Sequence, residues 1–315
     1  MRYESLGGNA MPRFGGPGTF MRLPEKPDAQ GLDVGIVGVP LDIGTSFRSG
    51  AHHAPKAIRA ESCLIRPYNM ATRAAPFDSL TIADVGDVPL NPFSLEKSVG
   101  IIQADVAERI VRHGAAPIAI GGDHTITLPL LRALTKRTGP VGLVHVDAHA
   151  DVNDRHFGEP VTHGTTFRRC LEEGLIEGRR VVQIGLRATG YTAEDFDWPR
   201  KQGFRVVQAE ECWHRSLTPL MAEVREQVKC GPVYLTFDID GLDPAYAMGN
   251  GSPEIGGLTT PQALEIIRGC RGLDMVGADL VEVSPPFEAN RNTCLTAANL
   301  LYEMLCVLPG VTYRN

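Results

Sequence analysis

Short apolar runs alternate with longer amphipathic segments over most of the chain. A continuous apolar run is typical of a parallel strand buried on both faces, and residues 33–40 (DVGIVGVP) give the first example. Further strands are predicted at residues 80–85, 116–120, 141–147, 181–185, 204–207, 233–239 and 275–281. Helical patterns lie between them, at residues 94–113, 125–135, 166–173, 217–228 and 293–308, and two more helices are predicted to begin near Pro55 and Thr260.

Strands that alternate with helices in this way form a parallel sheet, and right-handed crossovers place the helices on both of its faces. We therefore predict an α/β fold with three layers, α/β/α, around a parallel sheet of about eight strands. Residues 1–31 are rich in Gly and Pro and show neither pattern, so we predict an irregular N-terminal arm that lies on the surface or reaches a neighbouring subunit. Residues 32–315 contain no linker and are predicted to form a single domain.

Composition and charge exclude several classes of protein. Hydrophobic residues make up 43% of the chain and charged residues 22%, which leaves ample material for a core. The net charge of −6 and the lack of any Lys/Arg run argue against a nucleic-acid partner. Seven scattered cysteines form no C-x-x-C pair, and no secretory signal or membrane-length apolar stretch is evident. These features predict reduced thiols, a cytoplasmic location and no membrane association.

Acidic and imidazole side chains follow two of the predicted strands. Asp147, His149 and Asp151 end the strand at 141–147, and side chains two residues apart share a face of a strand. Asp238 and Asp240 repeat the arrangement at the end of the strand at 233–239. Carboxylates that converge in this way repel one another unless a positive charge lies between them, so the pattern predicts divalent cations.

Every unusual polar cluster of the sequence falls at the carboxyl end of a predicted strand, where the sites of such sheets lie. Six side chains are candidate metal ligands: His124, Asp147, His149, Asp151, Asp238 and Asp240. Carboxylates and imidazoles without thiolate suit Mn²⁺, Fe²⁺, Co²⁺, Ni²⁺ or Zn²⁺. Six ligands are few for two separate ions, so one or two aspartates must bridge. Bridging sets the ions roughly 3.5–4 Å apart, where they activate water near neutral pH.

Four residues near these ends allow more than one interpretation. His124 alone fits a helix cap as well as a ligand, and His145 lies deeper than Asp147, where we expect it to hydrogen-bond a ligand rather than bind metal. His163 closes the loop after Asp151 and is either a proton shuttle or a surface histidine. Glu282 is either a cap or a receptor for a cationic substrate, and its carboxylate would favour a guanidinium.

The motifs together resemble the signature of the ureohydrolase (arginase/agmatinase) family, over almost the whole chain from about Gly35 to Leu305. They are Gly-Gly-Asp-His (121–124), Asp-Ala-His-Ala-Asp (147–151), His-Gly (163–164), Phe-Asp-Ile-Asp-Gly-Leu-Asp-Pro (237–244) and Glu-Val-Ser-Pro-Pro (282–286). The guanidinobutyrase and guanidinopropionase branch looks nearest, on the evidence of residues 20–24, 154–158 and 163–169.

The resemblance implies an arginase-like catalytic domain over residues 32–315 with two divalent cations, usually manganese. One ion would be held by His124, Asp147, Asp151 and Asp238, and the other by His149, Asp147, Asp238 and Asp240. Asp151, His163 and Glu282 are then expected to be catalytic, with His163 matching the family's proton shuttle and Glu282 its guanidinium-binding glutamate. Homotrimers or homohexamers are common among relatives, and the arm would suit such an assembly.

Three departures from the family pattern affect the choice of substrate. Relatives usually carry Pro, Thr and Thr where Met248, Asn250 and Ser252 stand, in a loop that borders the guanidinium pocket. His52 and Ala54 replace the usual Arg and Gly, and His156 stands where guanidino-acid hydrolases carry a Tyr or Met. We expect substrate contacts from these side chains: Glu282, His156, Asn153, Ser252 and Asn250. Arg155 or His156 could supply positive charge for a distal carboxylate.

We therefore expect an enzyme that hydrolyses a small guanidino acid, such as 4-guanidinobutanoate, to urea and an amine. An agmatinase, or a hydrolase of alkylated guanidines or biguanides that uses Ni²⁺, is the alternative of the same class, because imidazole accepts either metal. A non-catalytic partner subunit with the same fold is a third. A phosphohydrolase should carry Arg or Lys beside the ions, where Glu282 stands instead.

Overall fold

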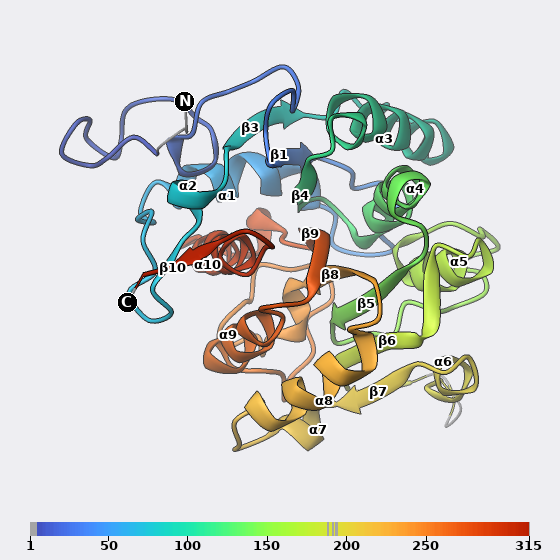
Figure 1. Ribbon diagram of the computed structural model, residues 1–315. Helices are drawn as coiled ribbons and strands as arrows, with labels where there is room; N and C mark the ends of the chain where they lie inside the picture. The colour runs from blue at the N-terminus through green and yellow to red at the C-terminus, as the bar shows by residue number, and fades with distance from the viewer. Residues whose placement is uncertain (1–4, 188, 191, 193–194, 315) are drawn as a thin grey trace.

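A parallel sheet of eight strands forms the centre of the computed structural model, which describes residues 5–187, 189–190, 192 and 195–314 (Figure 1). The strands lie in the order β3-β1-β4-β9-β8-β5-β6-β7, and every neighbouring pair in this sheet is parallel. Their bounds are β1 Val34–Val39, β3 Ile82–Asp87, β4 Ala116–Gly121, β5 Val141–Val146, β6 Ile176–Leu186, β7 Arg205–Gln208, β8 Pro232–Asp238 and β9 Asp274–Val281.

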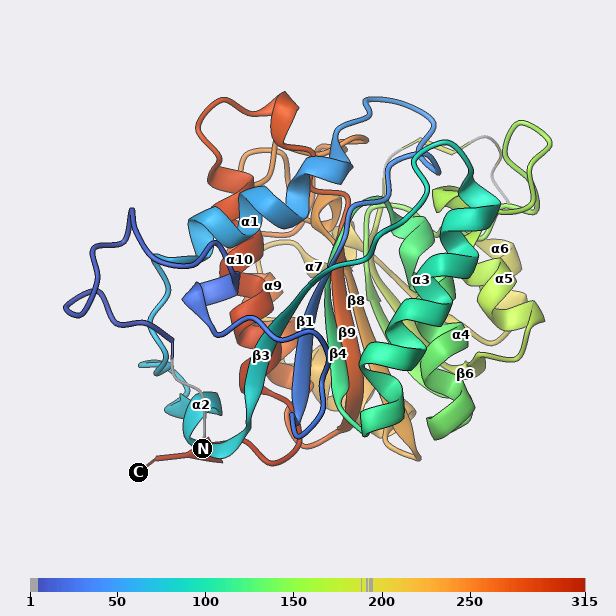
Figure 2. The ribbon, with the colours of Figure 1, turned by 90° about the horizontal axis from the view of Figure 1, so that it is seen from above.

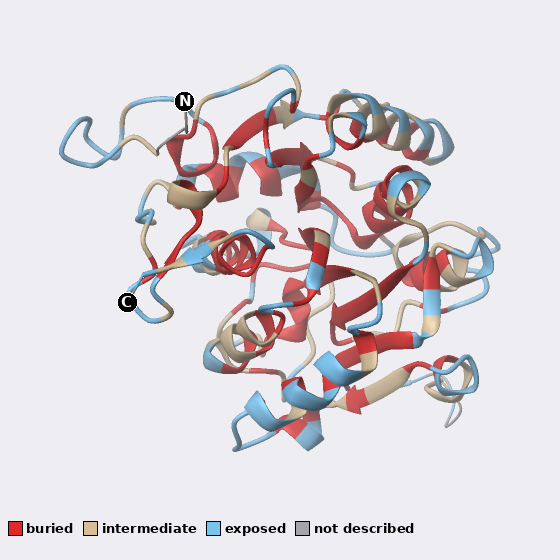
Figure 3. Ribbon diagram, viewed as in Figure 1, coloured by how far each residue is buried: buried red, intermediate tan, exposed pale blue. Residues whose placement is uncertain are grey.

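Helices cover both faces of the sheet, as Figure 2 shows. One face carries α1 (Ala54–Ser62), α10 (Asn292–Cys306), α9 (Thr260–Gly269) and α8 (Thr218–Val228), each packed on the next. The other carries α3 (Leu95–Arg109), α4 (Thr127–Thr138) and α5 (Thr166–Glu172). The predicted three-layer α/β/α fold is confirmed. The strands in the middle of the sheet are almost wholly buried, whereas the edge strand β7 is partly exposed, and the exposed surface of the helices faces outward (Figure 3).

Short elements account for most differences from the predicted boundaries, because a segment of two to five residues is too short to show a period. The helix predicted at 94–113 ends at Arg109 and continues as a 3-10 turn that stops at Gly114, whose φ is +83°. The strand predicted at 181–185 begins earlier, at Ile176. The unpredicted helices and strands are β2 Ala74–Ala75, paired with β10 Thr312–Tyr313, and α2 Pro76–Ser79, α6 Asp197–Lys201 and α7 Ala209–Cys212.

The described residues also form seven 3-10 helices. They are η1 Phe20–Arg22, η2 Ala51–His53, η3 Val111–His113, η4 His124–Ile126, η5 His163–Thr165, η6 Ile239–Gly241 and η7 Pro285–Phe287. Of the seven, η3 and most of η4 fall within segments predicted to be helical. Four of them (η4, η5, η6 and η7) lie at or near the carboxyl ends of the central strands, where the chain turns sharply to leave the sheet.

The N-terminal arm is irregular but is not wholly a surface feature. Residues 1–4 of the predicted arm lie outside the described residues. Phe20, Met21 and Leu23 are at most 2% exposed and belong to the hydrophobic core beside α1. The backbone N–H of Phe20 donates to Asp84 Oδ2 at 2.8 Å, which fixes this turn against β3. The prediction of a surface arm is therefore wrong for residues 19–23, whose apolar side chains have enough area to bury.

No helix in the described part of the chain is both long and apolar enough to cross a membrane.

Candidate metal centre and active site

Four adjacent strands in the middle of the sheet supply the candidate site. β4, β9, β8 and β5 are neighbours in that order, and all run parallel, so their carboxyl ends meet at one edge. His124 follows β4, Glu282 follows β9, Asp238 ends β8, and Asp147 follows β5. Residues far apart in sequence therefore converge because the strands that carry them are paired.

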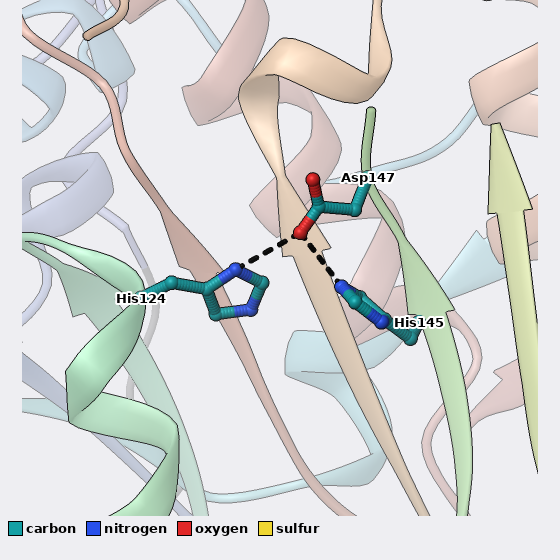
Figure 4. Close-up of side chains that lie close together, drawn as sticks. All are labelled: His124, His145 and Asp147. Carbon is teal, nitrogen blue, oxygen red and sulfur yellow. Dashed lines mark hydrogen bonds and ion pairs between the residues drawn. The ribbon is translucent and has the colours of Figure 1, made fainter. Parts of the chain in front are cut away.

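The first group of side chains surrounds His124. Its Nδ1 atom lies 3.1 Å from Asp147 Oδ2, 3.2 Å from Asp151 Oδ2 and 3.2 Å from Asp238 Oδ2 (Figure 4 shows the Asp147 contact). Both His124 and Asp147 are completely buried. Asp151 adopts a left-handed conformation with φ of +52°, which costs a non-glycine residue about 1–3 kcal/mol and is often found at functional sites.

The second group surrounds His149. Its Nδ1 atom lies 3.1 Å from Asp240 Oδ2 and 3.5 Å from Asp147 Oδ1. Asp147 therefore directs one carboxylate oxygen to each histidine, which is the disposition of a bridging ligand. Asp238 directs Oδ2 to His124, while its Oδ1 accepts the backbone N–H of Asp240 at 2.9 Å. The structure thus brings together all six predicted ligands.

The electrostatics of these carboxylates fit a cation between them. Burial and the negative charges of Asp240 and Asp147 raise the pKa of Asp238 well above its usual value. Burial and the charge of Asp147 likewise raise the pKa of Asp240, although His149 opposes the shift. No described residue hydrogen-bonds the buried His124 Nδ1. A buried nitrogen without a partner, faced by three carboxylates, fits a divalent metal ion of the kind that imidazole and carboxylate ligands bind.

His145 supports Asp147 from below the site. Its Nε2 atom lies 2.7 Å from Asp147 Oδ2, and both side chains are completely buried (Figure 4). The Gln183 side-chain amide, on β6, donates to His145 Nδ1 at 3.0 Å and to Ala150 O at 2.8 Å. Because Nδ1 accepts this bond, Nε2 carries the proton and donates it to Asp147. The predicted hydrogen-bonding role of His145 is confirmed, and Gln183 is an addition that the sequence did not suggest.

Glu282 and His163 form a pair beside the metal ligands. Glu282 Oε1 accepts the backbone N–H of His124 at 2.9 Å and lies 3.2 Å from His163 Nδ1. Glu282 is 6% exposed and also adopts a left-handed conformation, with φ of +63°. Burial lowers the pKa of His163, but the hydrogen bond and charge of Glu282 outweigh it and raise that pKa to about 9. The hydroxyl oxygen of Ser46 lies 3.1 Å from His163 Nε2 and can accept from the protonated ring.

A cleft opens from these residues to the surface. Its lining includes His149, Asp151, Asp238, Asp240, His163 and Glu282. The predicted substrate contacts Asn153, His156 and Ser252 also line it. Asn250 is completely buried, with Nδ2 donating to Ala247 O and Oδ1 accepting from Ser252 N. Both polar groups are used within its own loop, so the predicted direct contact of Asn250 is replaced by a role in shaping the loop that presents Ser252.

The positive charge in the cleft differs from the prediction. Arg155 donates to Gly158 O on an exposed turn. Arg168, which sequence reasoning missed, lines the cleft and stacks 4.8 Å from the Trp198 ring centroid. Arg187 also lines the cleft, but its guanidinium is buried and donates to backbone carbonyls of 185, 240–242 and 254–255, which fixes the loop after β8. Arg187 lies outside the motifs, and Arg168 lies within residues 163–169, where nothing in the sequence indicates that its side chain faces the cleft.

Comparisons with known proteins agree with this geometry. The sequence model of the Arginase family matches residues 32–306. The chain is 68% identical to a guanidinobutyrase of Pseudomonas aeruginosa over 315 residues, 99% of this chain and 98% of that protein. It is 58% identical to a mitochondrial agmatinase of Gallus gallus over 293 residues, 93% of this chain and 86% of that protein. Among solved structures, proclavaminate amidinohydrolase from Streptomyces clavuligerus superposes with a TM-score of 0.89 at 38% identity, covering 94% of this chain and 100% of that one.

Proposed function

Because the chain belongs to the arginase family of ureohydrolases, we propose that it hydrolyses a small guanidino acid, such as 4-guanidinobutanoate, to urea and an amine. The observation that carries this proposal is the buried carboxylate of Glu282, which lines a cleft beside two clusters of histidine and aspartate side chains that can bind metal. The 68% identity to a guanidinobutyrase supports the choice of a guanidino acid. The 58% identity to an agmatinase keeps agmatine as the second candidate substrate.

We assign two divalent cations to the six side chains, with Mn²⁺ as the expected metal and Ni²⁺ as the alternative. His124, Asp147, Asp151 and Asp238 would hold one ion, and His149, Asp147, Asp238 and Asp240 the other. Two observations support this assignment: the buried His124 Nδ1 has no hydrogen-bond partner among the described residues, and the pKa of Asp238 is raised. When bound, such a pair of cations makes water a nucleophile near neutral pH.

Glu282 would bind the guanidinium of the substrate, and His163 would transfer a proton to the departing amine. The planar guanidinium matches a carboxylate, and Glu282 is a buried acid that lines the cleft and is not one of the proposed metal ligands. A guanidinium on Glu282 competes with His163 Nδ1 for the same oxygen, so the pKa of His163 would fall from about 9 towards its ordinary value. His163 could then pass a proton to the nitrogen of the departing amine at neutral pH.

The tail of the substrate would lie towards His156 and Arg168. Arg168 lines the cleft and would provide a guanidinium for a distal carboxylate, although Glu172 and Asp154 share its charge. His156 also lines the cleft, and its buried Nδ1 has no hydrogen-bond partner among the described residues. An unpartnered buried polar atom is costly, and a substrate group could satisfy it.

Replacing His156 with methionine is expected to change substrate preference without removing metal. Pocket contacts of this size are worth about 1–3 kcal/mol, so the ratio of kcat/KM between guanidino acids that differ by one methylene should shift by about tenfold or more. Urea release gives the ratio, and elemental analysis gives the metal content. His53→Met, on an exposed turn, is the matched control and should leave both unchanged. Loss of metal in His156→Met would contradict a role limited to the substrate.

The test of the proposed function is urea release from guanidino acids, agmatine, arginine, guanidine and biguanides, with the purified protein loaded with Mn²⁺ or Ni²⁺. We expect the highest kcat/KM with a guanidino acid and Mn²⁺. Highest activity with agmatine or a biguanide would overturn the substrate assignment. A metal-loaded protein that releases no urea from any of them would favour the non-catalytic partner subunit.

The remaining features are proposed on the family resemblance. We propose a catalytic domain over residues 32–315 preceded by the arm of residues 1–31, a homotrimer or homohexamer, and a cytoplasmic location. The arm supports an assembly because its outer part exposes Phe14, at 96% of its maximum area, while Phe20 anchors its inner part to the core.

A further inference from the structure

A tryptophan in the wall of the cleft contacts the guanidinium of Arg168. Arg168 lies on α5 and Trp198 on α6, and both side chains line the cleft. The Arg168 Cζ atom lies 4.8 Å from the centroid of the Trp198 ring, within the roughly 6 Å range of a cation–π contact. The planar guanidinium stacks well on an aromatic face. The ring therefore limits the directions in which the Arg168 side chain can point.

Trp198 is itself fixed by the hydrophobic core. Its ring meets Phe204 edge-on, with ring centroids 6.2 Å apart and ring planes at 78°. Phe204 is 3% exposed and belongs to a core cluster against which Trp198 packs. The same cluster contains Phe167, the completely buried residue that precedes Arg168 on α5. One core therefore holds both the helix that carries the arginine and the ring that contacts it.

Two acidic residues occupy one edge of the Arg168 guanidinium. Its Nε–H donates to Glu172 Oε1 at 3.0 Å, and Nε lies 3.4 Å from Asp154 Oδ1. Arg169 Nη2 contacts the same two carboxylates, at 3.1 Å from Glu172 and 3.0 Å from Asp154. Two arginines therefore balance two carboxylates. Any preference of this cluster for an anion must come from the direction of its remaining N–H groups rather than from net charge.

The remaining N–H groups of Arg168 are those of Nη1 and Nη2. Neither nitrogen donates a hydrogen bond to a residue in the described part of the chain. Together they form the end of the guanidinium that can bind a carboxylate through two parallel hydrogen bonds. The Arg168 side chain is only 24% exposed, so such bonds would be partly protected from competing water.

We propose that Arg168 is a specificity-determining residue, which binds the distal carboxylate of the substrate through Nη1 and Nη2, and that Trp198 is the positioning residue that holds its guanidinium in the required direction. The inference rests on the proposed function and deepens it, because it concerns the end of the substrate remote from Glu282. A guanidinium that is already restricted before the substrate arrives loses less conformational freedom on binding.

Other acids in the cleft would favour the opposite kind of tail. Asp154 and Asp195 also line the cleft, and Asp195 accepts from the backbone N–H and the hydroxyl of Thr192 at 3.2 and 3.0 Å. An amine tail, such as that of agmatine, would approach these carboxylates and avoid Arg168. Removing the charge of Arg168 would then improve turnover of agmatine and leave that of a guanidino acid unchanged. Our inference predicts instead a selective loss for the guanidino acid.

The first test compares 4-guanidinobutanoate with butylguanidine, which has a guanidinium but no charge on its tail. In Arg168→Gln we expect KM for 4-guanidinobutanoate to rise about 10- to 100-fold, the loss of hydrogen bonds between charged groups, with kcat within about threefold. KM for butylguanidine should change less than about twofold. Arg132→Gln is the control, because it removes the same charge from a residue that pairs with Glu173 outside the cleft. Equal changes for both compounds in Arg168→Gln would overturn the inference.

The second test separates the positioning role of Trp198 from a structural one. Trp198→Leu removes the ring and Trp198→Phe keeps a smaller one, while Arg168 retains its charge in both. We expect the preference in KM for 4-guanidinobutanoate over butylguanidine to fall about 5- to 20-fold in Trp198→Leu and less than about threefold in Trp198→Phe. Adding Trp198→Leu to Arg168→Gln should cost nothing further, because both act on one contact. A further loss, or a rise in KM shared by both compounds, would show a merely structural role.

Calorimetric titration of the metal-free protein measures the binding of both compounds without turnover. The unaltered protein should bind 4-guanidinobutanoate more tightly than butylguanidine, and Arg168→Gln should remove most of the difference. Equal affinities in the unaltered protein would overturn the inference even if Trp198→Leu does not fold. A protein that shows the expected difference but releases no urea when loaded with metal would instead contradict the proposed function and leave the role of Arg168 standing.

Discussion

Replacing Asp238 with asparagine is expected to abolish urea release and to lower metal content below two ions per chain. The change removes the negative charge of a carboxylate that is 3% exposed and lies 3.2 Å from His124 Nδ1. A bound metal ion supplies several kcal/mol of transition-state stabilisation, so loss of its placement should cost about a thousandfold or more in kcat. Elemental analysis and a urea assay at saturating substrate measure the two effects.

Unfolding would not explain this result. Burial, Asp240 and Asp147 raise the pKa of Asp238, so its ionised form destabilises the metal-free fold at neutral pH, and a neutral asparagine relieves that repulsion. The amide oxygen of the introduced asparagine can still accept the backbone N–H of Asp240. We therefore expect the melting temperature of metal-free Asp238→Asn to equal or exceed that of the unaltered protein.

Asp243→Asn is the matched control for Asp238→Asn, because Asp243 lies only five residues further on, in the loop that follows β8. Its carboxylate accepts backbone N–H groups of Ala245, Gly256 and Gly257 and therefore supports only the loop. This variant should keep two ions per chain and most of the activity. Full turnover in Asp238→Asn, or equal loss in both variants, would show that Asp238 is not a metal ligand.

Replacing Glu282 with glutamine is expected to lower kcat/KM for the guanidino substrate by two to four orders of magnitude while metal content stays the same. Glutamine keeps the shape and can still accept the His124 N–H, but it lacks the charge that pairs with a guanidinium. Removing one partner of a buried ion pair costs about 3–5 kcal/mol, which sets the size of the effect. Steady-state urea release and elemental analysis on the same preparation measure both quantities.

The matched control for Glu282→Gln is Glu288→Gln, because Glu288 lies six residues further along the chain. Its carboxylate accepts the backbone N–H of Thr293 at the start of α10, outside the cleft. It should lower stability slightly and leave kcat/KM within about twofold. Near-normal kcat/KM in Glu282→Gln would mean that the guanidinium binds elsewhere, and loss of metal would mean that Glu282 supports the ions rather than the substrate.

The fold and the gathering of the six ligands could be predicted from the sequence because both depend on period and position. Apolar runs mark buried parallel strands, and the carboxyl ends of such strands share one edge, so Asp147 and Asp238 were expected at the same edge of the sheet. The order of the strands was not predicted. Local pattern does not say which strand pairs with which, and the contacts between β4, β9, β8 and β5 are all long-range.

Supporting residues could be predicted only in part. The hydroxyl of Thr236 lies 2.9 Å from His124 Nε2 and hydrogen-bonds Asp279 on β9. Thr236 shares the face of Asp238, and Asp279 is an acid in the buried part of its strand, so period 2 and buried charge were signals that could have marked both. Gln183, Arg168 and Arg187 carry no such signal, because their contacts with His145, Trp198 and the loop after β8 depend on tertiary pairings that the local sequence does not show. The side chain of Asn250 was misplaced for the same reason: its partners lie within its own loop, whose conformation has no periodic pattern.

The most direct measurement of the central claim is anomalous diffraction at the manganese edge from crystals grown with excess Mn²⁺. The account predicts two strong peaks at the carboxyl edge of β4, β8 and β5, one beside His124 and one beside His149, with Asp147 in contact with both. A single peak, peaks away from these six side chains, or no peak at all would contradict it.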